Sequence, residues 1–300
     1  MNRLPLELRA KIIAGCEYTD CMSFRATCSK NRDVGEYVLG KTQTFDFRHY
    51  RDRQIREEEA KKKKACVLNP TKMIEFMVFL PNVSKIILAD LPCTFTLSDM
   101  IKLGKSLPNL KKCVIIQTED CAWLANEVLL GLSYFESLEK LKIDGWEPRI
   151  VAKRGCAGRY EVIPAVTLRK LTSLTIICKQ ETVSKVLQHI LDNEVIMTKC
   201  VKAKFNVRLS SADIPHLIMK FIEFHPNIQK IAFNGFLFTT QEQVETFYNH
   251  LLALPQLERV HMENCSVIDR IEQALQRTFL EALRRRGIKF NNLVKSLRHG

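Results

Sequence analysis

The stretch of this chain that most directly suggests chemistry is Gly35-Glu36-Tyr37-Val38-Leu39-Gly40-Lys41-Thr42, which fits the pattern G-x-x-x-x-G-K-[ST]. In a phosphate-binding loop of this kind, a buried strand leads into the loop, and backbone N–H groups at the start of the next helix cradle the phosphate. Here Asn31-Arg32-Asp33 upstream is polar, and Thr44-Phe45-Asp46-Phe47 downstream alternates like a strand. The pattern lacks the strand and helix that nucleotide binding needs on either side of the loop. A P-loop nucleotide-binding protein is therefore the least favoured of three interpretations.

Other catalytic patterns are missing from the sequence. It contains no H-E-x-x-H, no G-x-S-x-G and no G-x-G-x-x-G. Its seven histidines are spread out, and none has a second ligand at metal-binding spacing. We therefore expect a protein that is not an enzyme, with no catalytic residues, cofactor or metal.

Composition limits the environment and the partners. The chain has 300 residues, 46% of them hydrophobic and 26% charged, and a formal net charge of +13, which favours an anionic partner. It has no apolar run of the roughly 20 residues that cross a membrane, and its N-terminus lacks the apolar core of a signal peptide. Eleven cysteines without a C-x-x-C pair suggest reduced thiols. We expect a cytoplasmic or nuclear location, and neither a membrane nor nucleic acid as a partner.

A repeated frame of apolar residues organises most of the chain. The spacing L-x-x-L-x-L begins at residues 83, 110, 138, 171, 200, 228 and 257, so the period is 27 to 33 residues. Amphipathic stretches that favour helices lie between these segments, as at 182–191, 212–224 and 240–254. Frame and period resemble leucine-rich repeats, in which each L-x-x-L-x-L forms a short parallel strand. The resemblance implies an α/β fold, a curved solenoid over 70–300, with an inserted excursion at 145–164.

The third position of the frame is basic in six of seven repeats. Because alternate strand residues face opposite sides, we expect this position to project from the sheet away from the core. Adjacent cations in such a ladder repel by about 1 kcal/mol per pair in water, which an acidic or phosphorylated target would relieve. The alternative is that lysine is simply a soluble residue at an exposed position. The candidate target-binding residues are Lys85, Lys112, Lys140, Lys202, Lys230 and Arg259, with Ser173 in the remaining repeat.

The first forty residues carry a different pattern. Leu4-Pro5-Leu6-Glu7-Leu8, then Ile12-Ile13, then Phe24-Arg25-Ala26-Thr27-Cys28-Ser29-Lys30 resembles an F-box in order and spacing. The resemblance implies a helical module at 1–40 that docks onto the Skp-type adaptor of a Skp–cullin–F-box ubiquitin ligase. The alternative is a helical hairpin that caps the repeats. The adaptor-facing residues that the resemblance implies are Leu4, Pro5, Leu8, Ile12 and Ile13.

Together these features predict three consecutive segments with different roles. The module at 1–40 is followed by an irregular first strand and a charged insertion at 41–69, and then by the repeats. We interpret the protein as the substrate receptor of a Skp–cullin–F-box ubiquitin ligase, with a Skp-type adaptor, a cullin bound through it, and a target protein as partners. The alternative is a leucine-rich-repeat binding scaffold unconnected to ubiquitin.

Overall fold

The computed structural model of this chain describes residues 5–14, 16, 18–51, 70–91, 95–117, 126–145, 163–207 and 214–297. The chain forms two compact units, Met1–Leu138 and Glu139–Gly300. Both are α/β, with helices alternating with parallel strands, as the sequence predicts. The expected boundaries at 40/41 and 69/70 stay predictions, and most of the charged insertion and of the excursion lies outside the described residues.

The first unit begins with three helices, α1 (Leu6–Ile13), α2 (Tyr18–Arg25) and α3 (Ser29–Gly40). Its strands pair in parallel in the order β1-β2-β3, with Phe45 opposite Ile86 and Ile86 opposite Cys113. The strand-like alternation seen from Thr44 corresponds to β1, which is only three residues long. The elements after α3 are β1 (Thr44–Asp46), α5 (Pro70–Met77), β2 (Lys85–Ala89), α6 (Leu97–Ser106), β3 (Lys112–Ile116), α7 (Asn126–Leu130) and the 3₁₀ helix η1 (Gly131–Tyr134).

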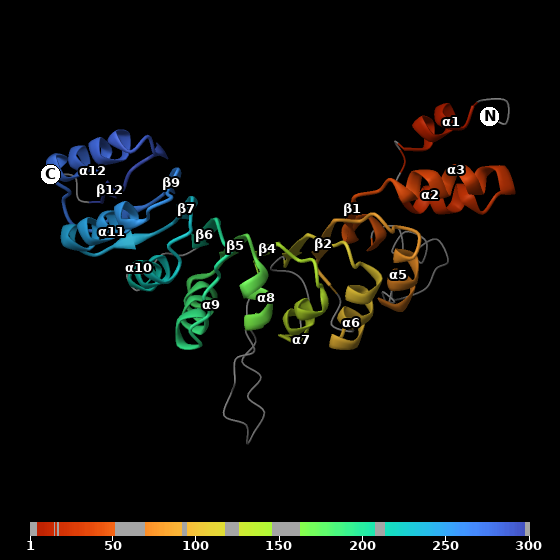
Figure 1. Cartoon of the computed structure of the whole chain (residues 1–300), viewed down its shortest axis with the longest axis horizontal. Helices are drawn as coiled ribbons and strands as arrows, with labels where there is room; N and C mark the ends of the chain where they lie inside the picture. Colours follow the sequence, from red (N-terminus) through yellow and green to blue (C-terminus); the bar gives the residue numbers. More distant parts are fainter. Residues whose placement is uncertain are drawn as a thin grey trace, which may run out of the picture. The chain divides into compact units, whose positions relative to one another are not determined.

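The second unit holds six parallel strands of the described chain in the order β4-β5-β6-β7-β9-β11. Helices α8, α9 and α10 lie on one side of β4, β5 and β6 (Figure 1). The strands are β4 (Lys140–Asp144), β5 (Ser173–Cys178), β6 (Lys202–Val207), β7 (Lys230–Asn234), β9 (Arg259–Glu263) and β11 (Lys289–Asn291). The helices are α8 (Ala165–Lys170), α9 (Gln180–Asp192), α10 (Ile214–Phe224), α11 (Gln241–Ala253) and α12 (Gln273–Arg285).

The apolar frame of the sequence forms the core of these repeats. The second and fourth residues of each strand from β4 to β9 are buried, whereas the first and third are exposed or half-buried. In β7, for example, Ile231 and Phe233 are buried, and the ring of Phe233 packs 5.1 Å from that of Phe247 on α11. Burial on one face of the strands and one stripe of each helix is the main stabilising term of such repeats.

Several details of the second unit differ from the expectation. A second small sheet pairs three two-residue strands in the order β12-β10-β8, namely β12 (Lys295–Ser296), β10 (Ser266–Val267) and β8 (Leu237–Phe238). Helix α12 begins at Gln273, after β10 has ended at Val267. Gly287 follows this helix with a φ of 67°, the left-handed conformation in which many helices end.

Left-handed residues end many of the strands. The residue directly after β2, β4, β7, β9 and β11 has a positive φ in each case. After β4, the backbone N–H of Gly145 donates to the carbonyl oxygen of Ile177 on the next strand over 2.7 Å. After β7, the N–H of Gly235 donates in the same way to the carbonyl oxygen of Glu263 over 3.0 Å. The turn thus satisfies a backbone donor while it directs the chain out of the sheet. The five residues are Asp90, Gly145, Gly235, Asn264 and Asn292.

Candidate functional site

The stretch that fits the phosphate-binding pattern does not form a loop. Gly35 to Gly40 lie inside α3, and Lys41 and Thr42 follow its C-terminal end. That end of a helix carries a partial negative charge and so repels phosphate. Gly35 has a packing role instead, because a Cβ atom there would lie 2.8 Å from the Cβ of Arg25 on α2. The geometry gives no support to the third interpretation.

The described part of the predicted adaptor surface lies on α1. Leu8 and Ile12 are one helical turn apart and are 46% and 48% exposed, so together they form an apolar strip open to solvent. Pro5 at the N-cap is also exposed. Ile13 is buried within the chain and cannot face a partner in this conformation. Leu4 lies outside the described residues.

The remaining N-terminal helices contact the first repeat of their own unit. The guanidinium of Arg25 on α2 lies 4.5 Å from the ring centre of Phe79, which follows α5. Asn82 donates a side-chain hydrogen bond to the carbonyl oxygen of Gly40 at the end of α3. Arg25 also pairs with Glu36 on α3 over 2.8 Å. These contacts attach α2 and α3 to the repeats, whereas Leu8 and Ile12 of α1 remain exposed.

The predicted ladder of basic residues begins each strand, on the face opposite the core. In the first unit Thr44, Lys85 and Lys112 pair in register, and both lysines are half-buried. In the second unit six residues, which we call the basic row, pair in register from strand to strand. The basic row consists of Lys140, Ser173, Lys202, Lys230, Arg259 and Lys289.

Backbone hydrogen bonds hold this register. The carbonyl oxygen of Glu139 accepts from the N–H groups of Thr172 and Ser173, at 2.7 and 3.2 Å. Thr172, Val201 and Gln229 accept two such bonds each from the following repeat in the same way. The first residues of the strands therefore stand side by side at the ordinary strand spacing of about 4.8 Å.

Lys289 is a member of the basic row that sequence analysis missed. Its repeat has Gly287 at the first apolar position and Asn292 at the sixth, so the L-x-x-L-x-L frame is not visible there. Only the pairing of Lys289 with Arg259 reveals the additional repeat. The only trace of this repeat in the sequence is the fourth position of the frame, where Phe290 is apolar.

A second row runs parallel to the basic row on the same face. Its members are also in register, two residues further along each strand. Lys142 pairs with Asp144 over 2.9 Å, and His261 with Glu263 over 3.6 Å. The second row consists of Lys142, Thr175, Lys204, Ala232, His261 and Asn291.

Some cations on this face are neutralised and others are not. In the basic row, Lys230 lies 3.5 Å from Glu258, with both side chains well exposed, so this pair contributes little to stability. By contrast, Lys202, Lys204 and Arg259 form no ion pair with any described residue. Four cations of this face, namely Lys202, Lys204, Lys230 and Arg259, thus lie on the neighbouring strands β6, β7 and β9, and only Lys230 among them has an ion pair with a described residue.

The buried cysteines are not candidates for catalysis or metal binding. Burial raises the pKa of the Cys200 and Cys265 thiols to about 11 and that of Cys113 to about 12, so they stay uncharged at neutral pH. A thiol in this state is neither a nucleophile nor a metal ligand. Within the described ranges, no group of three or more His, Cys, Asp or Glu residues is arranged to hold a metal ion. None of the described helices is long and apolar enough to cross a membrane.

Comparison with known proteins assigns no family. No family model matches this sequence, and no curated protein matches it. Among solved structures, the chain is similar to a Bacteroides fragilis protein whose crystal structure was determined by a structural genomics consortium. The TM-score is 0.43 and the identity 11%, over 81% of this chain and 82% of the other. A similarity at this level carries no argument about function.

Proposed function

We propose that this protein is the substrate receptor of a Skp–cullin–F-box ubiquitin ligase, working in the cytoplasm or nucleus. In this proposal the N-terminal helices form an F-box and the strand–helix repeats form a leucine-rich-repeat-like solenoid. The F-box binds a Skp-type adaptor and, through it, a cullin, and the repeats hold a target protein. Support comes from the F-box-like residue order, the in-register parallel repeats and the exposed strip of α1.

The proposed mechanism requires no catalytic group in this chain. A receptor accelerates ubiquitin transfer by holding target lysines near a charged enzyme on another subunit, which raises their effective concentration.

The observation that carries the proposal is the strip formed by Leu8 and Ile12. Two large apolar side chains exposed one turn apart favour a partner that covers them. We predict that the double variant Leu8→Ala, Ile12→Ala loses adaptor binding, because truncating an interface hot spot costs about 2–4 kcal/mol, or about 30- to 1,000-fold in affinity. Co-purification of a Skp-type adaptor with the full-length chain measures this.

Val78 provides the matched control for this experiment. It is an apolar residue of the same unit, 73% exposed and distant in sequence from α1. Val78→Ala should leave adaptor binding unchanged. Unchanged co-purification of the Leu8, Ile12 variant, or failure of the unaltered chain to bind any Skp-type adaptor, would reject the F-box assignment.

The second candidate is a binding scaffold unconnected to ubiquitin, in which the N-terminal helices cap the repeats. The contacts of Arg25 with Phe79 and of Asn82 with Gly40 favour it, because a capping hairpin is attached to the first repeat in this way. The burial of Ile13 also removes one of the predicted adaptor contacts. Truncation of α1 separates the candidates: a receptor would lose its adaptor and keep its target, whereas a scaffold has no adaptor to lose.

A further inference from the structure

The face of the second unit that carries the basic row is open to a partner. Lys140, Lys202, Lys230, Arg259 and Lys289 are all exposed, whereas the residues that follow them on strands β4 to β9 are buried on the other face. Helices α8 to α10 lie on one side of β4 to β6 (Figure 1). Lys202 on β6 and Arg259 on β9 form no ion pair with any described residue, and Lys230 stands between them on β7 at the ordinary strand spacing of about 4.8 Å, so three like charges lie side by side with only the exposed Glu258 near them. A bound anion would relieve this repulsion.

We propose that this open face binds an extended acidic segment of a partner protein, laid across the strands along the basic row. The proposal rests on the proposed receptor function, because it names the chemical class of the target segment. The row contains six strands and so spans about 24 Å, which an extended peptide of about seven residues covers. A charge distributed over that length matches a run of carboxylates better than one isolated anion.

The centre of the binding face lies around Ala232. Its small side chain stands in the second row between Lys204 and His261, on the same strand as Lys230. A carboxylate above this methyl group would therefore have the ammonium group of Lys204 on one neighbouring strand and the imidazole of His261 on the other. On the other side of Lys204, the hydroxyl of Thr175 adds a hydrogen-bond donor. This arrangement brings Lys202, Lys204, Lys230 and Arg259 together on the neighbouring strands β6, β7 and β9.

The residues that follow the second row along each strand limit the width of the cationic surface. Asp144, Asn206, Asn234 and Glu263 stand two residues beyond the second row, so a partner meets carboxylates and amides there instead of further cations. A narrow cationic band suits a single extended chain. The described outward-facing residues of β4 to β11 also include no Phe, Tyr or Trp on which nucleic acid bases could stack. The occupant is therefore an acidic polypeptide segment.

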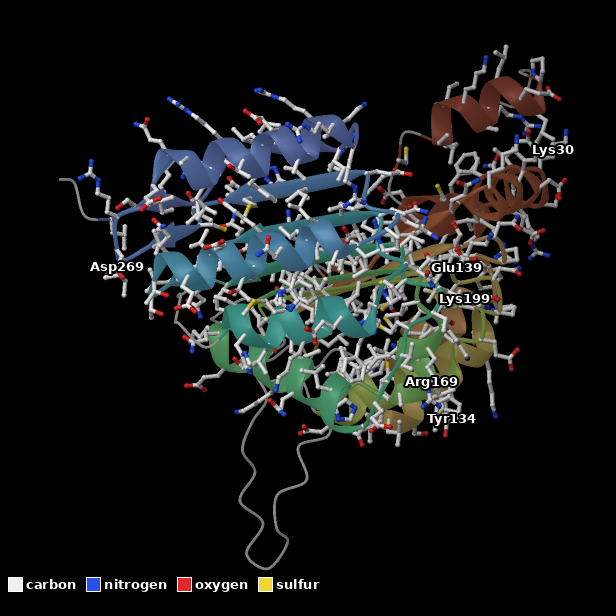
Figure 2. All side chains as sticks on the ribbon, turned by 60° about the vertical axis from the view of Figure 1, so that its left-hand side comes forward. Lys30, Tyr134, Glu139, Arg169, Lys199 and Asp269 are labelled. Carbon is white, nitrogen blue, oxygen red and sulfur yellow. The ribbon has the colours of Figure 1, made fainter. Side chains whose placement is uncertain are left out.

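The test uses the full-length chain and a fluorescent peptide of alternating Glu and Ser, about seven to ten residues long. The double variant Lys202→Glu, Lys230→Glu should weaken binding of this peptide at least about tenfold. The matched control is the double variant Arg169→Glu, Lys220→Glu, which changes the net charge by the same amount. Arg169 lies on α8 (Figure 2) and Lys220 on α10, away from the basic row. The control variant should stay within about threefold of the unaltered chain, and binding should weaken steeply with salt.

Three comparison probes make the result decisive. The same peptide with Gln in place of Glu should not bind. The proposal is overturned if the Glu peptide does not bind, if the control variant loses as much affinity, or if the Gln peptide binds equally well. It is also overturned if a phosphoserine peptide or single-stranded RNA binds while the Glu peptide cannot compete.

Failure of this proposal can be told apart from failure of the proposed function. The Lys202, Lys230 variant should retain its Skp-type adaptor, because the changes lie on β6 and β7 and not on α1. If the unaltered chain binds the Glu peptide but no adaptor, the receptor function fails and the acidic-segment surface stands. If it binds the adaptor but not the peptide, the opposite holds.

Discussion

At the scale of single residues, His225 is a position where burial and hydrogen bonding oppose one another. It is only 2% exposed and stacks on the ring of Phe221 at a centroid distance of 4.2 Å. Both ring nitrogens face carbonyl oxygens, Nδ1 that of Phe221 at 2.7 Å and Nε2 that of Val195 at 3.2 Å. Burial is the larger effect and lowers the pKa of His225, although the two carbonyls act to raise it.

This balance predicts that acid destabilises the second unit. In the unfolded chain His225 takes up a proton near its ordinary pKa of 6.5, whereas the folded chain resists protonation. The unfolded state thus binds more protons below about pH 6.5, and the free energy of unfolding falls as the pH drops through the lowered folded pKa. Burial lowers the pKa of His189 as well, which adds to the effect. Urea unfolding at pH 7 and pH 5 measures it.

The variant His225→Phe should lose less stability between pH 7 and pH 5 than the unaltered chain, while being about 1–3 kcal/mol less stable at pH 7, because one buried carbonyl loses the single N–H donor of the neutral imidazole. His216→Gln, at an exposed position on the same helix, is the control. An identical acid response in the Phe variant would show that His225 does not contribute.

At the scale of elements, the sequence predicts those with a strong period. Helix α5 begins at Pro70 and buries Met73, Phe76 and Met77, as the spacing of its apolar residues and the proline at its start indicate. The two-residue strands β8, β10 and β12 could not be predicted, because they are too short to carry a period. At the start of α11, the Thr240 side chain accepts from Gln243 N at 3.2 Å, and the Gln243 side chain accepts from Thr239 N at 2.8 Å.

The turn after β7 depends on a glycine in the left-handed conformation. Gly235 has a φ of 76°, and a Cβ atom there would lie 2.2 Å from the carbonyl oxygen of Val207. Gly235→Ala should therefore lower the free energy of unfolding by roughly 3 kcal/mol or more, from backbone strain and a clash with a fixed backbone atom. Chemical denaturation followed by circular dichroism measures the loss.

Gly287 separates the two causes. It has a similar φ of 67°, but a Cβ atom there would meet nothing within 4 Å. Gly287→Ala should lower the stability by only about 1–2 kcal/mol, the cost of the left-handed conformation alone. Equal losses in the two variants would mean that the close approach of Val207 does not matter.

At the scale of the whole molecule, the repeats and most of the candidate site could be predicted from the sequence. The period places Lys140, Lys202 and Lys230 at equivalent positions, and strand alternation puts them on the face opposite the core. Sequence alone could not show that Lys204 forms no ion pair with any described residue or that Lys142 pairs with Asp144, because these depend on register and on contacts in space. Likewise, the helical spacing of α1 did not reveal that Ile13 faces inward while Ile12 faces solvent.

The second unit should unfold as one cooperative block, because each repeat buries its apolar face only against its neighbours. Ile231 on the central strand β7 is 2% exposed and stands between Ala203 and Val260. Ile231→Asp places an unpaired charge there and should lower the free energy of unfolding by roughly 4 kcal/mol or more. Hydrogen exchange should then show protection lost together from β5 to β9, and not in β7 alone.

The adjacent residue provides the control, because Lys230 lies on the opposite face of the same strand. Lys230→Asp introduces the same side chain into an exposed position and removes only a surface ion pair with Glu258, so it should cost less than about 1 kcal/mol. The two variants differ by one position in sequence, and only the alternation of a half-buried strand separates their effects. Similar losses in both, or a loss of protection confined to β7 in Ile231→Asp, would contradict a continuous core across Glu139–Gly300.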